Sequence, residues 1–266
     1  MWPYRVPHGV NRVRPTSKET PWVRESPPRC QAHPRPRVSV TPGDVLRQAA
    51  SAKGFVLVGV AIAFGWPLVL LIPGVSGLSI SSIRDDTVNI GVKWLVAAGL
   101  CTIAFWAQRR PPSDFGIRRL RWGDVLAAIG GVIVGIALSG VANHTVALPP
   151  SADDLKEIAA VSVGVRLTLV MTAGICEEFI YRSFAIEELT ILTGKRWLAA
   201  VLAWVFFTVG HVRLYNLSTA LIVPGTLGAL LTLLYLWRRN LASCALMHAA
   251  VDAMFIVLLP AMVKTA

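Results

Sequence analysis

Residues 125–143 read Val-Leu-Ala-Ala-Ile-Gly-Gly-Val-Ile-Val-Gly-Ile-Ala-Leu-Ser-Gly-Val-Ala-Asn and contain no charged side chain. Two further stretches lack charge, one between Lys53 and Arg84 and one from Leu214 to Trp237. About 20 consecutive apolar residues span the hydrocarbon core of a bilayer as a helix. The sequence therefore indicates a membrane protein with several transmembrane helices.

The composition of the whole chain agrees with this class. Of the 266 residues, 54% are hydrophobic and only 15% are charged, whereas about a quarter of the residues in a typical soluble domain are charged. A water-soluble enzyme is therefore disfavoured, and a disordered protein, a fibre and a disulfide-stapled secreted domain are excluded. The four cysteines form no CxxC pair and no metal-ligand spacing.

Most of the net charge of +11 lies at the N-terminus. Residues 1–53 hold ten Lys/Arg against three Asp/Glu, together with nine of the 17 prolines. Such a segment cannot bury much apolar surface, so residues 1–53 are expected to be a disordered basic tail. Beside a first membrane helix, the tail is expected to set topology near anionic lipid. No nucleic-acid partner is expected, because no recognition fold accompanies the charge.

Seven apolar segments can be drawn, and their length favours helices over the shorter strands of a membrane barrel. They cover residues 54–73, 88–107, 125–143, 163–193, 197–212, 216–237 and 241–262. With the N-terminus in the cytoplasm, 19 Lys/Arg lie on the inner side and six on the outer side, as the positive-inside rule requires. The outer six are Arg84, Lys93, Lys156, Arg166, Arg213 and Lys264. The prediction is an all-α, multi-pass protein of the cell membrane with about seven spans and a cytoplasmic N-terminus.

Acidic residues or histidines interrupt three of these segments. The fourth contains Glu177, Glu178 and Arg182, the fifth ends at His211, and the seventh carries His248 and Asp252. A charge at the bilayer centre costs about 2.5–3.5 kcal/mol on insertion scales, so such residues usually face a cavity and pair with one another. A polar intramembrane cavity is therefore expected, with any chemistry within residues 165–255.

Helical spacing assigns partners within this set. Glu178 and Arg182 are four residues apart and share a helix face, so we expect an ion pair. Glu177 is rotated from Glu178 by about 100° and is expected to be the unpaired, titratable acid. Asp252 can reach His248 across one turn. Glu177 and the two histidines then suit activation of a water, or binding of Zn²⁺ with a water in its open position.

The three motifs, in this order, resemble those of the CPBP family of intramembrane proteases, which includes the type II CAAX prenyl proteases and the bacteriocin self-immunity (Abi) proteins. They are Glu177-Glu178-x-x-x-Arg182, Phe207-x-x-x-His211 and His248-x-x-x-Asp252, preceded by a further similar stretch, Ser113-Asp-Phe-Gly-Ile-Arg118. The likeness covers about residues 110–258. Residues 108–262 are accordingly expected to be a CPBP-like protease domain, preceded by two accessory transmembrane helices at 54–107.

The resemblance implies a role for each motif. Glu177 and His211 would activate the attacking water. His248 and the residue four positions later would stabilise the oxyanion, while Glu178 and Arg182 would support the site. The substrate would be a protein or peptide at the lipid bilayer, processed as CAAX-box proteins are. The cofactor stays open between a metal-free glutamate mechanism and a metalloendopeptidase, in which Glu177, His211 and His248 would hold the metal.

At its last motif position, the sequence departs from the family pattern. The last motif residue is often Asn in CAAX proteases and is Asp252 here. An ionised carboxylate cannot donate to an oxyanion, so Asp252 is expected to orient His248 or ligate a metal.

The predicted depths of the site residues do not agree with one another. In the seven-segment topology, Glu177 and His211 lie about 21–24 Å from the cytoplasmic helix ends and His248 about 10 Å. The site closes only if tilt, a late start to the last helix or unwinding near Asn240 brings them level.

Two other classes of function stay open beside the endopeptidase. A non-catalytic immunity or regulatory membrane protein would use the polar site to bind a partner. A proton-coupled transporter would also place Glu, His and Arg inside the membrane, although the sequence shows no inverted repeat.

Overall fold

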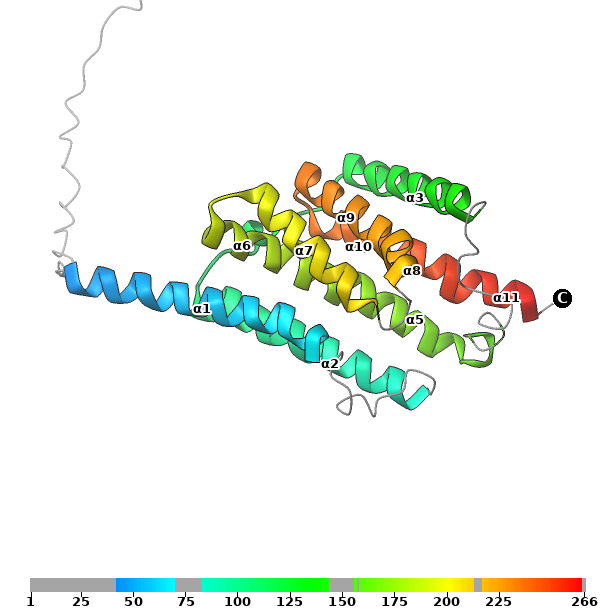
Figure 1. Ribbon diagram of the computed structural model, residues 1–266, viewed down its shortest axis with the longest axis horizontal. Coiled ribbons are helices and arrows are strands. Elements are labelled where there is room, and N and C mark those ends of the chain that lie inside the picture. Colours follow the sequence, from blue (N-terminus) through cyan, green and yellow to red (C-terminus); the bar gives the residue numbers. More distant parts are fainter. Residues whose placement is uncertain (1–41, 70–82, 144–155, 157, 213–216, 265–266) are drawn as a thin grey trace, which may run out of the picture. The chain divides into compact units, whose positions relative to one another are not determined.

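The computed structural model describes residues 42–69, 83–143, 156, 158–212 and 217–264, which form helices and no strands (Figure 1). The α-helices are α1 (Pro42–Val69), α2 (Ile83–Cys101), α3 (Trp122–Asn143), α5 (Val163–Thr172), α6 (Ile186–Thr193), α7 (Arg196–Gly210), α8 (Leu217–Ile222), α9 (Pro224–Arg238), α10 (Leu241–Ala253) and α11 (Leu259–Lys264). Three segments are π-helical, η1 (Thr102–Ala107), η3 (Ala173–Ala185) and η4 (Met254–Leu258), and η2 (Pro112–Phe115) is a 3₁₀ turn. The predicted all-α class is confirmed.

Four helical stretches in the described part of the chain are long and apolar enough to cross a bilayer. They are Val88–Ala107, Trp122–Ala142, Leu217–Arg238 and Leu241–Met262. The protein is therefore a multi-span membrane protein. Two further apolar helices, Lys53–Trp66 and Arg196–Gly210, are shorter. The stretch from Val163 to Thr193 is continuous but carries the acidic residues of η3 and α6. The count of seven spans stays a prediction.

Helix α1 begins earlier than the composition predicted. It starts at Pro42, inside the stretch expected to be disordered, and continues through the first apolar segment. Proline suits the first turn of a helix, and residues 46–52 (Leu-Arg-Gln-Ala-Ala-Ser-Ala) are mostly good helix formers. The rest of the predicted tail, residues 1–41, lies outside the described residues.

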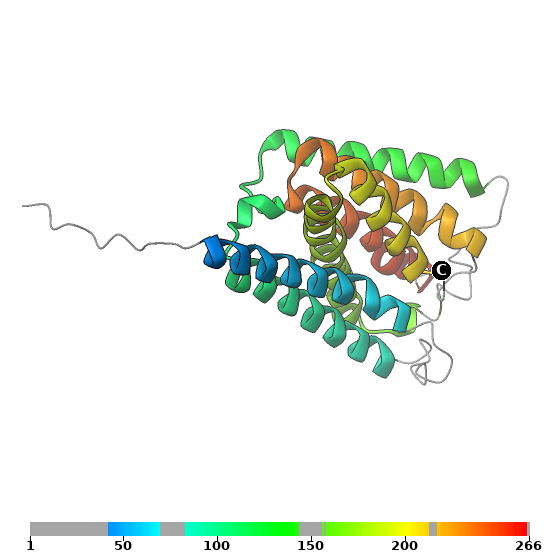
Figure 2. The same cartoon turned by 60° about the vertical axis from the view of Figure 1, so that its left-hand side comes forward.

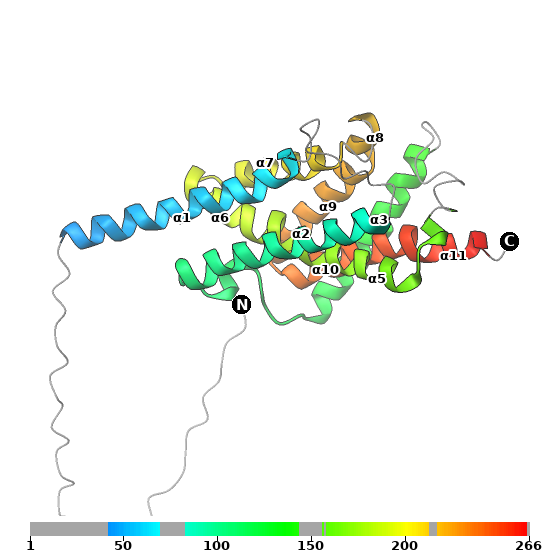
Figure 3. The same ribbon diagram turned by 90° about the horizontal axis from the view of Figure 1, so that it is seen from below.

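The π-helix η3 lies at the centre of the bundle. It packs against α2, α5, α6, α7 and α10, and every residue from Cys176 to Ala185 is buried. In Figure 2, α1 and α2 lie along one side and α3 along the opposite side, with the other helices between them. Figure 3 shows α1 and α2 running alongside each other, in agreement with their direct packing. The three motifs therefore lie on helices that meet in the interior.

Two glycines allow this close approach. A Cβ added at Gly174 in η3 would lie 3.1 Å from both the carbonyl oxygen of Ala245 and the Cβ of Ala249 in α10. A Cβ added at Gly228 in α9 would lie 2.7 Å from the ring of Phe207 in α7. Small residues at helix contacts let membrane helices pack with their backbones close together.

Ion pairs around two buried carboxylates join one end of the bundle. Glu188 in α6 is fully buried and pairs with Arg110, and Gln108 donates to it at 2.9 Å. Glu187 pairs with Arg196 and Arg239 and accepts a hydrogen bond from Tyr235 at 2.9 Å. The sequence assigned no role to these two acids. The structure shows that they tie α6 to α7, to the end of α9 and to the connection after η1.

The connection between η1 and α3 also reaches the turn between α9 and α10. The backbone N–H of Leu241 donates to the carbonyl of Gly116 at 2.9 Å. A Cβ at Gly116, whose φ is +71°, would lie 2.9 Å from the ring of Tyr235, so both the backbone angle and the space favour glycine. In Figure 1 the α9–α10 turn ends short of the α6–α7 turn. Helix α10 therefore begins deeper in the bundle than in the predicted topology, where all segments begin at the same depth.

Two cations counted on the outer side point into the bundle. Arg166 in α5 is buried and donates to the carbonyls of Ile256 and Val257 in η4, at 3.2 and 3.4 Å. Lys93 in α2 is partly buried and pairs with an acid of η3. Both therefore serve contacts between helices.

Candidate active site

The first motif lies entirely within η3. Glu177, Glu178 and Arg182 are 4%, 0% and 1% exposed. π-Helical turns have i→i+5 hydrogen bonds and occur frequently at functional sites. The two adjacent carboxylates point in different directions, as the sequence predicted, although the helix is π rather than α at this point.

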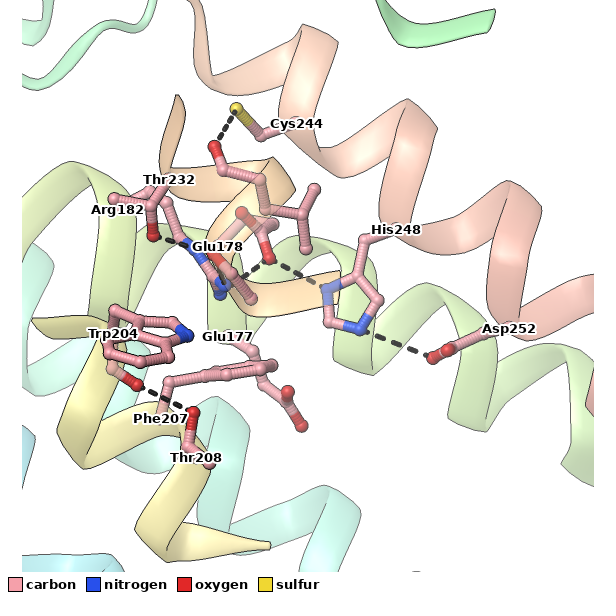
Figure 4. Close-up of polar contacts among 12 residues, drawn as sticks. Glu177, Glu178, Arg182, Trp204, Phe207, Thr208, Thr232, Cys244, His248 and Asp252 are labelled. Carbon is pink, nitrogen blue, oxygen red and sulfur yellow. Dashed lines mark hydrogen bonds and ion pairs between the residues drawn. The ribbon is translucent and has the colours of Figure 1, made fainter. Parts of the chain in front are cut away.

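Glu178 is the centre of a buried ion-pair chain. Its Oε1 accepts a hydrogen bond from Nη1 of Arg182 at 2.9 Å, which confirms the predicted pair. The same oxygen lies 2.7 Å from Nδ1 of His248 in α10 (Figure 4). Arg182 also donates to the carbonyl of Gly228 at 3.1 Å, and its guanidinium lies 4.1 Å from the ring centroid of Phe207. Arg182 thus joins η3 to α9 and α7 while balancing the charge of Glu178.

His248 lies between two carboxylates. Its Nδ1 faces Glu178, and its Nε2 lies 3.5 Å from Oδ2 of Asp252, so the predicted contact across one turn is present. Asn240 caps α10 by accepting a hydrogen bond from the N–H of Ala242 at 3.1 Å. With α10 starting deep in the bundle, His248 is level with Glu178, and the expected mismatch in depth does not arise.

Glu177 is not the unpaired acid that the sequence predicted. Its Oε1 forms an ion pair with Nζ of Lys93 at 2.5 Å. Spacing along one helix identifies only partners on that helix, whereas Lys93 comes from α2, which packs along η3. Lys93 is the residue that the sequence interpretation missed. Its one signal was its position as the only charged residue of segment 88–107.

The other oxygen of Glu177 faces His211. Oε2 is buried, has no hydrogen-bond partner among the described residues and lies 4.0 Å from Nε2 of His211. Nδ1 of His211 lies 2.7 Å from the carbonyl of Phe207, which can only accept. A neutral His211 therefore carries its proton on Nδ1 and presents Nε2 as an acceptor. A separation of 4.0 Å is too long for a direct hydrogen bond, but one water can bridge it with hydrogen bonds of about 2.8 Å.

The possible metal ligands do not converge. Among the described residues, no group of three His, Cys, Asp or Glu side chains is arranged to hold an ion. Both nitrogens of His248 face carboxylates, which leaves Glu177 and His211 as the remaining candidates. A catalytic zinc site uses three protein ligands. The residues in this arrangement therefore do not fit a zinc ion.

Comparison with known proteins identifies the domain that holds these motifs. The family model described as type II CAAX prenyl endopeptidase Rce1-like matches residues 159–254. No curated protein and no solved structure matched the chain. The match contains all three motifs and confirms the resemblance to the CPBP family. Helix α2, with Lys93, and the connection after η1 lie outside the matched residues.

Proposed function

Because residues 159–254 form an Rce1-like domain of the type II CAAX prenyl endopeptidase kind, we propose that this protein is an intramembrane endopeptidase. It hydrolyses a peptide bond of a membrane-associated protein or peptide by attack of water, as in CAAX-type processing. It acts in the cell membrane with its N-terminus in the cytoplasm. The observation that carries the proposal is the 4.0 Å separation between Oε2 of Glu177 and Nε2 of His211, two acceptors that can share one water.

The two acceptors define how the water would be activated. One O–H of the water donates to Glu177 and the other to Nε2 of His211, which leaves the oxygen lone pairs free to attack. Glu177 takes a proton as the water oxygen bonds to the scissile carbonyl carbon, which gives a tetrahedral oxyanion. Glu177 then returns the proton to the leaving amine as the C–N bond breaks. General-base catalysis of this kind contributes about 10²- to 10⁴-fold to the rate.

In the proposed mechanism, His248 stabilises the oxyanion. Carboxylates only accept, so both ring nitrogens of His248 donate when its two contacts form. The 3.5 Å contact with Asp252 is the longer one, and it is the one that a substrate oxyanion would replace. Asp252 would orient the ring until the oxyanion forms, and Glu178 with Arg182 would hold it from the other side throughout.

The test uses purified protein in lipid and a mixture of membrane-derived peptides. Glu177→Gln keeps the shape of the side chain and removes the base, so we expect cleavage to fall by at least about 100-fold. Asp114→Asn in η2 is the acid-to-amide control; this carboxylate is 42% exposed and pairs with Arg110 four residues before it, so the variant should cleave normally. Equal cleavage by Glu177→Gln would refute the mechanism. A Glu177→Gln protein that cleaves nothing and still protects or regulates in cells as the wild type does would favour the non-catalytic immunity or regulatory class.

A further inference from the structure

Lys93 lies at a position where a charged side chain is energetically unfavourable. It is the only charged residue between Val88 and Ala107, a stretch that is long and apolar enough to cross the bilayer. A lysine within a membrane span is costly unless it pairs or reaches water. Its side chain is 17% exposed, and its partner Glu177 is 5% exposed. The ammonium is thus largely withdrawn from solvent and directed at the acid proposed as general base.

The register of α2 makes this direction a property of the helix. Lys93 lies on the same face of α2 as Ala97 and Leu100, which are both buried in the core. The neighbouring Trp94 donates from Nε1 to Oγ1 of Thr172, the last residue of α5, at 3.1 Å. This hydrogen bond fixes α2 against the helix that leads into η3. The buried face of α2 and the hydrogen bond of Trp94 therefore both hold Lys93 beside Glu177.

Charge balance around Glu177 depends on Lys93. Arg182 is engaged by Glu178, and within the described residues no other lysine or arginine pairs with Glu177. The other ionisable groups around Glu177 are Cys176, Glu178 and Tyr181 on η3 itself, His211 in α7, and His248 and Asp252 in α10. His248 already faces two carboxylates. An opposite charge within about 4–6 Å favours the charged form of a carboxylate.

We propose that Lys93 is a positioning residue of the catalytic centre, contributed by a helix outside the family-matched domain. Its ammonium keeps Glu177 ionised and fixes Oε1, so that Oε2 is the oxygen presented to His211 and to the water. The inference rests on the proposed function for its catalytic meaning. The state of Glu177 that it specifies can be measured without any substrate.

Infrared spectroscopy tests the state of Glu177 directly. Difference spectra between each protein and its Glu177→Gln counterpart isolate this side chain. We expect a carboxylate band in the wild type and in Lys93→Arg, and a protonated carboxyl band in Lys93→Met and Lys93→Gln. Leu95→Ala, on the exposed face of the same helix, is the packing control and should match the wild type. A carboxylate band in both Lys93→Met and Lys93→Gln, or a protonated carboxyl in the wild type, would overturn the proposal.

Kinetics separate positioning from simple helix docking. Lys93→Met should lower kcat by about 100-fold with KM changed by less than about threefold, because the base is lost while the substrate still binds. Lys93→Arg should recover activity to within about tenfold of the wild type. A Lys93→Gln variant that cleaves like the wild type would show that the charge is not needed. If the wild type cleaves no peptide, the proposed function fails, and the infrared result still decides the role of Lys93.

Discussion

His248 places Nδ1 2.7 Å from Oε1 of Glu178, on the same oxygen that accepts from Arg182. One buried carboxylate therefore joins the first and third motifs, which lie 70 residues apart. The two adjacent glutamates therefore have different roles. Glu178 builds the scaffold, while Glu177 faces Lys93 and His211.

This division predicts that loss of the charge of Glu178 costs stability. Glu178→Gln should destabilise the protein by about 3–5 kcal/mol, because it leaves the guanidinium of Arg182 buried without its counter-charge. Replacing both residues, as in Glu178→Gln/Arg182→Met, should cost less than the sum of the two single changes. Unfolding in mixed detergent micelles measures both effects. Additive losses would show that the pair is not coupled.

The contact between α9 and α7 predicts a steric effect at Gly228. The Cβ of Gly228→Ala would lie 2.7 Å from the ring of Phe207, which stacks on Arg182 and precedes His211 by one turn. The ring must shift, so we expect a loss of about 1–3 kcal/mol in stability and reduced cleavage. Gly140→Ala in α3 is the control, because no atom lies within 4 Å of its Cβ. Equal behaviour of the two variants in thermal unfolding would contradict the close packing.

The long contact between His248 and Asp252 predicts tolerance at the last motif position. Asp252→Asn keeps an oxygen that can accept from Nε2 of His248, so cleavage should stay within about tenfold of the wild type, whereas His248→Ala should lose about 100-fold or more. Asp252→Leu, which removes the acceptor, should fall between them. Initial rates on one peptide substrate give the order. A complete loss of activity in Asp252→Asn would mean that the negative charge itself is required.

The sequence predicted the class of fold and the pairs that lie within one helix. Apolar length defines membrane helices, and the spacing of four residues defines Glu178–Arg182 and His248–Asp252, so both kinds of inference are local. The π-helical geometry of η3 was not predicted, because an extra residue in a helical turn leaves no mark in an apolar pattern.

Contacts between helices could not be derived in the same way. Lys93 looked like an outer cation because a single charge near a segment end suits a loop as well as a buried pair. The depth of His248 depended on where the α9–α10 turn lies, which the hydrogen bond between Gly116 and Leu241 fixes from a different part of the chain. Neither contact can be derived from the sequence of a single helix.

Four exposed tryptophans predict where the bilayer surface lies. Trp106, Trp122, Trp197 and Trp237 are 64–83% exposed, and each lies at the end of a helix next to the basic segments assigned to the cytoplasmic side. Tryptophan concentrates at the level of the lipid headgroups. These four should therefore share one depth, at the cytoplasmic surface.

Fluorescence quenching by brominated lipids measures this depth. The emission lost in each Trp→Phe variant should be quenched by bromine near the headgroup and little by bromine near the chain end. Trp94 is the control, because it lies twelve residues before Trp106, or about 18 Å along the helix, and should be quenched by bromine within the chains. If Trp94 and Trp106 were both quenched at the depth of the headgroups, α2 would lie along the membrane surface and would not span the bilayer.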